Sequence, residues 1–224
     1  MYSAFHAPIT EDDPWSYVRG LQSGSLCDWA GRVSAVLFLG GCNLRCPTCH
    51  NACLAWNPEQ YPLIPKNSVQ HFLQTRAPWL DGLVLSGGEP TCVPQISTLV
   101  QGLSSLGLPI KLDTNGMGPK TVASLLSQGL IQAVAVDVKG PWAKYPQLTG
   151  GYCSPQQAQS SLEAIFDLAR TMPEDFHFRC TAVPELGTHD LDAVQQAVPS
   201  GFRVTIQTYI PPDNTSSSYT IPTQ

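Results

Sequence analysis

Short apolar segments alternate along the chain with longer segments in which apolar residues recur every three or four positions. The short segments are rich in Val, Ile and Leu or otherwise apolar, as expected of strands buried on both faces of a parallel sheet. They predict six strands, at residues 33–39, 82–86, 110–113, 133–138, 176–183 and 203–207.

The longer segments predict amphipathic helices between these strands. In residues 158–170, for example, Leu162, Ile165 and Phe166 follow the spacing that places apolar side chains on one helical face. The same spacing predicts helices at residues 68–75, 96–106 and 120–128, and a weaker one at 190–198.

Alternating strands and helices predict an α/β fold with a mostly parallel sheet and right-handed crossovers. A closed barrel of eight units usually needs about 250 residues, so six units in a chain of 224 residues favour an open, partial (β/α)6 TIM-like barrel. We expect an N-terminal extension over residues 1–22, one barrel domain over 23–210 and a loose C-terminal tail over 211–224. Functional residues should gather where the strands end.

The composition indicates which partners and which environment to expect for this protein. Hydrophobic residues make up 42% of the chain and charged residues 13%, so the chain can bury a core. The net charge is −5 and no Lys/Arg cluster is present, which predicts no nucleic-acid partner. The N-terminus has no basic region followed by an apolar run, and no apolar run approaches the roughly 20 residues of a membrane span. These features predict a soluble, cytoplasmic protein without a membrane partner.

Four of the eight cysteines lie between Cys42 and Cys53. A disulfide framework belongs to short secreted chains, so this crowding predicts a metal site. Cys42, Cys46 and Cys49 follow the first predicted strand directly and therefore lie in a strand-end loop. Thiolates bind iron–sulfur clusters, and a cubane takes four ligands. Three thiolates would leave one iron open to a substrate or cofactor.

Two other kinds of site remain open at this point. A structural zinc module usually has paired Cys-x-x-Cys knuckles, and the sequence lacks a second knuckle. Cys53 could complete a four-thiolate set, and the chain would then be an iron–sulfur electron carrier. Replacing Cys53 separates a carrier from an open-cluster enzyme, because only the carrier would lose its cluster, and metal analysis separates both from a zinc module.

The cysteine spacing resembles the Cys-x3-Cys-x2-Cys signature of the radical S-adenosylmethionine (SAM) superfamily. Ser86-Gly87-Gly88-Glu89-Pro90 resembles the motif that binds the methionine amino group there. Four further motifs resemble the anaerobic ribonucleoside-triphosphate reductase activating proteins, which are glycyl-radical-enzyme activases: Asp28-Trp29-Ala30-Gly31, Leu112-Asp113-Thr114-Asn115-Gly116, Val136-Asp137-Val138-Lys139 and Leu148-Thr149-Gly150. The resemblance covers about residues 23–207.

This resemblance implies a [4Fe-4S] cluster and SAM as cofactors. Reductive cleavage of SAM would produce a 5′-deoxyadenosyl radical that abstracts hydrogen from a glycine of a partner, so no side-chain base is needed. The implied partners are the large subunit of anaerobic ribonucleotide reductase, through its glycine-bearing loop, and a flavodoxin- or ferredoxin-type electron donor. The alternatives within the superfamily are the activase of another glycyl radical enzyme and a small-molecule enzyme similar to 7-carboxy-7-deazaguanine synthase.

The resemblance also assigns residues to the SAM site: Gly87, Gly88, Glu89, Asn115, Asp137 and Lys139. Paired glycines could form an ordinary turn, but at a strand end they favour close backbone approach to a ligand. Asp113 and Asp137 end neighbouring predicted strands, so their carboxylates should converge unless each caps the next helix. With Thr114 they resemble a monovalent-cation site of hard oxygen ligands.

Some positions depart from the family pattern. Thr48 stands where an aromatic residue often precedes the third cysteine, and Gln207 where some relatives place a histidine. The extra cluster domain of some activases is missing, so one cluster is expected. Four scattered cysteines are predicted to be small buried hydrophobic residues, namely Cys27, Cys92, Cys153 and Cys180.

Overall fold

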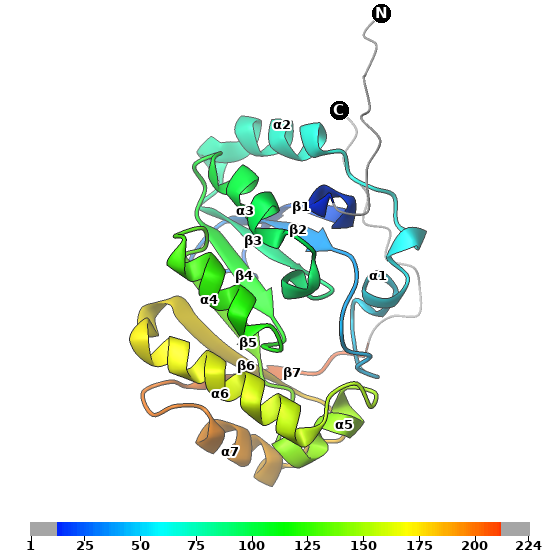
Figure 1. Ribbon diagram of the computed structural model, residues 1–224, viewed down its shortest axis with the longest axis vertical. Helices are drawn as coiled ribbons and strands as arrows, with labels where there is room; N and C mark the ends of the chain where they lie inside the picture. The colour runs from blue at the N-terminus through cyan, green and yellow to red at the C-terminus, as the bar shows by residue number, and fades with distance from the viewer. Residues whose placement is uncertain (1–12, 212–224) are drawn as a thin grey trace, which may run out of the picture.

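A single seven-stranded sheet organises the computed structural model, which describes residues 13–211 (Figure 1). Strand β1 runs antiparallel to β2, and β2 to β7 are parallel. The spatial order follows the chain: β1 (Val18–Ser25), β2 (Ser34–Leu39), β3 (Gly82–Gly87), β4 (Ile110–Thr114), β5 (Ala133–Asp137), β6 (Phe176–Ala182) and β7 (Val204–Thr208). The predicted open α/β fold with six parallel strands is confirmed.

The six predicted strands match the observed ones to within one residue at each end. Strand β1 was not predicted, because its sequence contains two glycines and mostly polar residues and so lacks a strand-like pattern. Before it, Trp15 in the short helix η1 (Pro14–Tyr17) is buried in the main core. The expected domain boundary after residue 22 is therefore wrong, since it falls inside β1. The expected C-terminal tail lies, apart from residue 211, outside the described residues.

The longer helices follow the strands and pack on one face of the sheet (Figure 1). Five correspond to predictions: α2 (Lys66–Arg76), α3 (Ile96–Ser104), α4 (Pro119–Ser127), α6 (Pro155–Thr171) and α7 (Thr188–Ala197). Two short helices, α1 (Ala52–Trp56) and α5 (Tyr145–Leu148), were not predicted. Helix α6 shows why the sequence folds this way. Ser154 and Gln157 form a capping box at its start, and its apolar face enters the core.

The two faces of the sheet differ in character. Residues such as Leu37 and Leu112 belong to the main core beneath the helices. The opposite, inner face carries a smaller apolar cluster that includes Val36 and Val84. On β4, Lys111 alternates with apolar core residues, so it points to the inner face. The expectation that all strands are apolar on both faces is therefore wrong for β4, β5 and β6, because the inner face of these strands carries charged side chains. Among residues 13–211, no helix has the length and apolar character needed to cross a bilayer.

Candidate functional site

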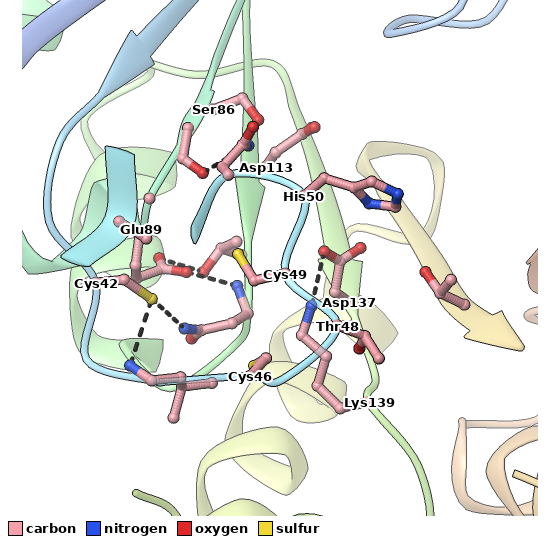
Figure 2. Close-up of a pocket in the computed structure, with 18 of the residues that line it drawn as sticks. Cys42, Cys46, Thr48, Cys49, His50, Ser86, Glu89, Asp113, Asp137 and Lys139 are labelled. Carbon is pink, nitrogen blue, oxygen red and sulfur yellow. Dashed lines mark hydrogen bonds and ion pairs between the residues drawn. The ribbon is translucent and has the colours of Figure 1, made fainter. Parts of the chain in front are cut away.

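A pocket of about 230 Å³ lies at the carboxyl ends of the parallel strands (Figure 2). Every site residue predicted from the sequence lines it: Cys42, Cys46, Cys49, Gly87, Gly88, Glu89, Asp113, Thr114, Asn115, Asp137 and Lys139. Thr48 and Gln207, the two departures from the family pattern, line it as well. The fold thus brings together residues from positions 42 to 207, because parallel strands present their carboxyl ends at one edge.

The predicted cluster ligands lie in the loop between β2 and α1, which we call the cysteine loop (residues 40–51). Burial raises the pKa of the Cys42 thiol to about 11, and it also raises the pKa values of Cys46 and Cys49. A positively charged metal centre would offset this cost and favour the thiolates. Cys53 is exposed in α1 and is not among the residues that line the pocket.

The three cysteines suit a multinuclear cluster. Among residues 13–211, no three His, Cys, Asp or Glu side chains are placed to hold a single metal ion. A cubane, by contrast, takes each thiolate on a different iron, so its ligands need not converge on one point. Soft thiolates are also the donors that iron–sulfur clusters require. The donor set of the pocket therefore fits such a cluster.

The glycines of the Ser-Gly-Gly-Glu-Pro motif support the cysteine loop. The backbone N–H of Gly88 donates to the carbonyl of Leu39 at 2.7 Å, and that of Glu89 donates to the carbonyl of Gly41 at 2.8 Å. A Cβ on Gly88 would lie 1.9 Å from the Gly41 oxygen. Gly87 has a φ of +110°, which a side chain would strain. Both glycines therefore lie close to the chain's own backbone, and their close approach to a cofactor stays a prediction.

Glu89 links the ends of β3 and β4. It is buried, with 1% of its surface exposed. Oε1 accepts from the Thr91 N–H at 3.1 Å, the Thr91 hydroxyl at 2.6 Å and the Thr114 hydroxyl at 2.7 Å, while Oε2 accepts from the Asn115 N–H at 2.7 Å. Burial raises the pKa of Glu89, and these hydrogen bonds oppose the rise. Oε2 keeps acceptor capacity for an ammonium group.

Two other motifs contact the cysteine loop, the one that contains Asn115 and the Leu-Thr-Gly motif. The amide of Asn115 donates to Asn43 Oδ1 at 2.8 Å and lies 3.9 Å from Cys42 Sγ. The Arg45 N–H donates to the carbonyl of Thr149 at 3.2 Å. A Cβ on Gly150 would lie 2.3 Å from the Arg45 oxygen, so the Leu-Thr-Gly motif packs tightly beneath the loop. These contacts give both motifs a structural role that their sequences did not reveal.

Asp113 and Asp137 converge at one rim of the pocket, as predicted from their positions at neighbouring strand ends. The guanidinium of Arg179 lies between them, with Nη1 at 3.2 Å from Asp113 Oδ2 and Nε at 2.9 Å from Asp137 Oδ1. Lys111 pairs with Asp113 at 2.7 Å. Lys139 pairs with Asp137 at 3.2 Å, as Figure 2 shows. The three oxygen groups expected to hold a monovalent cation are thus engaged, since the Thr114 hydroxyl donates to Glu89.

Sequence reasoning missed Arg179 and Lys111. The signal was present as a period-two alternation of apolar and polar residues in Phe176-His177-Phe178-Arg179 and Ile110-Lys111-Leu112-Asp113. The prediction for the remaining cysteines was half right. Cys153 and Cys180 are buried, whereas Cys27 and Cys92 are exposed.

A cysteine loop at the open end of an α/β barrel is the arrangement of an enzyme that binds a cofactor at an iron–sulfur cluster. Residues 36–194 match the family model of the radical SAM superfamily, and the chain belongs to this superfamily. Its members are enzymes that use a [4Fe-4S] cluster and SAM, and these are the cofactors of this chain.

Two curated relatives are similar to this chain over different lengths. A protein of Methanocaldococcus jannaschii named "Putative glycyl-radical enzyme activating enzyme MJ1227" is 30% identical over 200 residues, which cover 88% of this chain and 81% of that protein. The 7-carboxy-7-deazaguanine synthase of Hyperthermus butylicus is 37% identical over 92 residues, which cover 41% of this chain and 38% of the synthase.

Solved structures share the fold. SuiB of Streptococcus suis, bound to S-adenosylmethionine, has a TM-score of 0.54 and 19% identity over 80% of this chain and 40% of its own. The coproporphyrinogen III oxidase HemN of Escherichia coli has a TM-score of 0.54 and 18% identity over 78% of this chain and 43% of its own. This chain therefore spans less than half the length of either protein, and the likeness concerns the fold alone.

Proposed function

We propose that this chain is a glycyl-radical-enzyme activase and that its target is the large subunit of anaerobic ribonucleotide reductase. The cluster and SAM together supply a 5′-deoxyadenosyl radical. The substrate is a glycine in a loop of the partner, which gives up one hydrogen atom from its Cα. The electron comes from a flavodoxin- or ferredoxin-type donor.

One observation carries this proposal. The similarity to the archaeal activating enzyme extends over 88% of this chain and 81% of the relative. The similarity to the synthase covers only 41% of this chain. A match over nearly the whole length includes the segments outside the shared cofactor site, where differences in substrate are encoded.

The residues of the pocket have separate roles in the proposal. Cys42, Cys46 and Cys49 would hold the cluster, and a cluster with three protein thiolates would leave a position for SAM. Glu89 Oε2 accepts a hydrogen bond from the SAM ammonium group. Lys139 attracts the SAM carboxylate. Gly87, Gly88, Asn115 and Asp137 complete the proposed SAM site, and Gly88 and Asn115 also hold the strand ends and the cysteine loop in position.

The experiment combines cofactor cleavage with an isotope test. The protein is reconstituted anaerobically with iron and sulfide, reduced, and mixed with SAM and an anaerobic ribonucleotide reductase that contains α-deuterated glycine. We expect 5′-deoxyadenosine that carries deuterium, together with a glycyl radical detected by electron paramagnetic resonance. The matched controls are Cys42→Ala in this chain and Gly→Ala at the radical position of the partner. Cleavage of SAM without deuterium transfer from the glycine of any glycyl radical enzyme to 5′-deoxyadenosine would reject the activase proposal.

The partial match to the synthase favours one alternative, a radical SAM enzyme that acts on a small molecule. Under that alternative, the cluster-loaded protein would form 7-carboxy-7-deazaguanine from the synthase substrate without a protein partner. Mass spectrometry of the small-molecule products distinguishes this result from glycyl radical formation. An activase for a different glycyl radical enzyme would instead transfer deuterium from that enzyme and not from the reductase.

A further inference from the structure

Five charged side chains alternate in sign across the inner face of three neighbouring strands. They form a continuous set of ion pairs in the order Lys111, Asp113, Arg179, Asp137 and Lys139. We call this set the charge ladder. Its distal end, at Lys111, is buried, with 4% of the side chain exposed. Its other end, at Lys139, is 30% exposed and lines the cofactor pocket.

Arg179 is the centre of the charge ladder because of the register of the sheet. It pairs directly with Asp137 across β5 and β6. Asp113 pairs with Ala135 on the intervening strand, and this small residue leaves room for the arginine to reach across. A planar guanidinium with several donors can bind two carboxylates at once, which a single lysine ammonium does less well. Its side chain is only 19% exposed.

The charges of the ladder do not balance among its own five members. Three cations face two carboxylates, so one positive charge is left over. Burial opposes charge on Arg179 and Lys139, but the nearby carboxylates outweigh it and raise the pKa of both groups. Both therefore stay charged at neutral pH. An anionic group bound at the pocket end would neutralise the surplus, whereas an added metal cation would enlarge it.

We propose that Arg179 is a built-in counter-ion that takes the place of a bound monovalent metal ion at this rim. SAM binding to this chain consequently does not depend on K⁺ or Na⁺. The guanidinium holds Asp113 and Asp137 in position, and this positioning leaves the Lys139 ammonium directed at the pocket. Because the arginine is part of the chain, the site does not exchange its cation with the solution. This proposal concerns cofactor binding and is independent of the molecule that supplies the hydrogen atom.

The test compares the wild type with Arg179→Gln and Arg179→Lys at equal ionic strength in choline chloride, NaCl and KCl. The first readout is the melting temperature of the metal-free protein, and the second is the equilibrium Kd of SAM for the cluster-loaded protein. In the wild type, both quantities should be the same in the three salts. In Arg179→Gln, K⁺ or Na⁺ should raise the melting temperature and tighten SAM binding at least about fivefold relative to choline, a typical coupling between two ligands.

Two further variants sharpen the result. Arg179→Lys retains a positive charge and should show no dependence on the metal cation. The double variant Arg179→Gln with Asp113→Asn should gain neither melting temperature nor SAM affinity from K⁺ or Na⁺. It lacks one of the two carboxylates, Asp113, that would hold the cation. A merely structural role of Arg179 predicts weaker folding in every salt and no selectivity for K⁺ or Na⁺ over choline.

Two outcomes would overturn the proposal. The first is tighter SAM binding in KCl than in choline chloride for the wild type, since a separate cation would then be needed beside Arg179. The second is a folded Arg179→Gln protein without cation-selective recovery. If Arg179→Gln does not fold, the wild type and Arg179→Lys are compared in the same salts, and tighter SAM binding in KCl or NaCl than in choline chloride for either protein overturns the proposal. Glycyl radical formation is measured separately, so either result leaves the proposed function to its own test.

Discussion

The carbonyl oxygen of Gly41 lies 1.9 Å from the position that a Cβ on Gly88 would occupy. The cysteine loop and the end of β3 therefore pack backbone against backbone, and the Glu89 N–H closes the contact by donating to the same oxygen at 2.8 Å. The geometry of the cysteine loop thus depends on the absence of a side chain on Gly88, the residue that follows β3.

Gly88→Ala should displace the cysteine loop. We expect a loss of about 3 kcal/mol in the free energy of unfolding, the upper range for overpacking a tight contact, and reduced iron content after reconstitution. Gly24→Ala is the matched control, because Gly24 is exposed and a Cβ there meets nothing within 4 Å. Denaturant unfolding and iron analysis measure both effects. Equal stability and iron content in the two variants would refute the role assigned to Gly88.

Cys53→Ala should keep the cluster and the cleavage of SAM. Cys53 is exposed and lies outside the set of residues lining the pocket, so it is not expected to be a ligand. Iron and sulfide analysis and 5′-deoxyadenosine formation are the measurements, with Cys46→Ala as the variant that should lose both. Loss of the cluster in Cys53→Ala would instead favour a four-thiolate electron carrier.

Thr114→Val should destabilise the protein through Glu89. The Thr114 hydroxyl donates to Glu89 Oε1 at 2.7 Å in a buried environment. Valine keeps the shape but removes this donor from a buried carboxylate, which costs about 1–3 kcal/mol. Thr114→Ser keeps the hydroxyl and should retain most of that stability. Unfolding curves of the three proteins test the expectation, which fails if serine and valine cost the same.

Asp137 should make the stability of the metal-free protein depend on pH in acid. Burial alone would raise its pKa, but Lys139 and Arg179 outweigh burial and lower the pKa below the usual value of about 3.9. A lowered carboxyl pKa stabilises the folded state above the unfolded pKa, and this contribution is lost as pH falls through the folded pKa.

Asp137→Asn should therefore flatten the fall in unfolding free energy between about pH 5 and pH 2. Asp167→Asn is the control, because Asp167 forms an ion pair with Arg170 on the surface with 76% of its side chain exposed. Such a pair contributes little to stability. In Asp167→Asn, the unfolding free energy should therefore fall with decreasing pH as steeply as in the wild type. If the unfolding free energy falls equally steeply with decreasing pH in the wild type and in Asp137→Asn, the electrostatic role of Asp137 is contradicted.

Local sequence determined a large part of this protein. Hydrophobic periodicity located six of the seven strands and the five longer helices, because each burial pattern is a property of a continuous segment. The spacing of Cys42, Cys46 and Cys49 indicated a cluster loop for a similar reason, since all three lie within one short connection. Strand β1 was not predicted, because its pairing with β2, and not its own composition, makes it a strand.

The tertiary structure decided the contacts between segments. Arg179 is far from Asp113 in sequence, and only the order and register of β4, β5 and β6 bring its guanidinium between two carboxylates. The same holds for Gly88 and the cysteine loop, where the glycine approaches backbone 47 residues earlier in the chain. Periodicity specifies which face a side chain occupies. Which partner it meets there depends on strand order, and that order is a property of the whole fold.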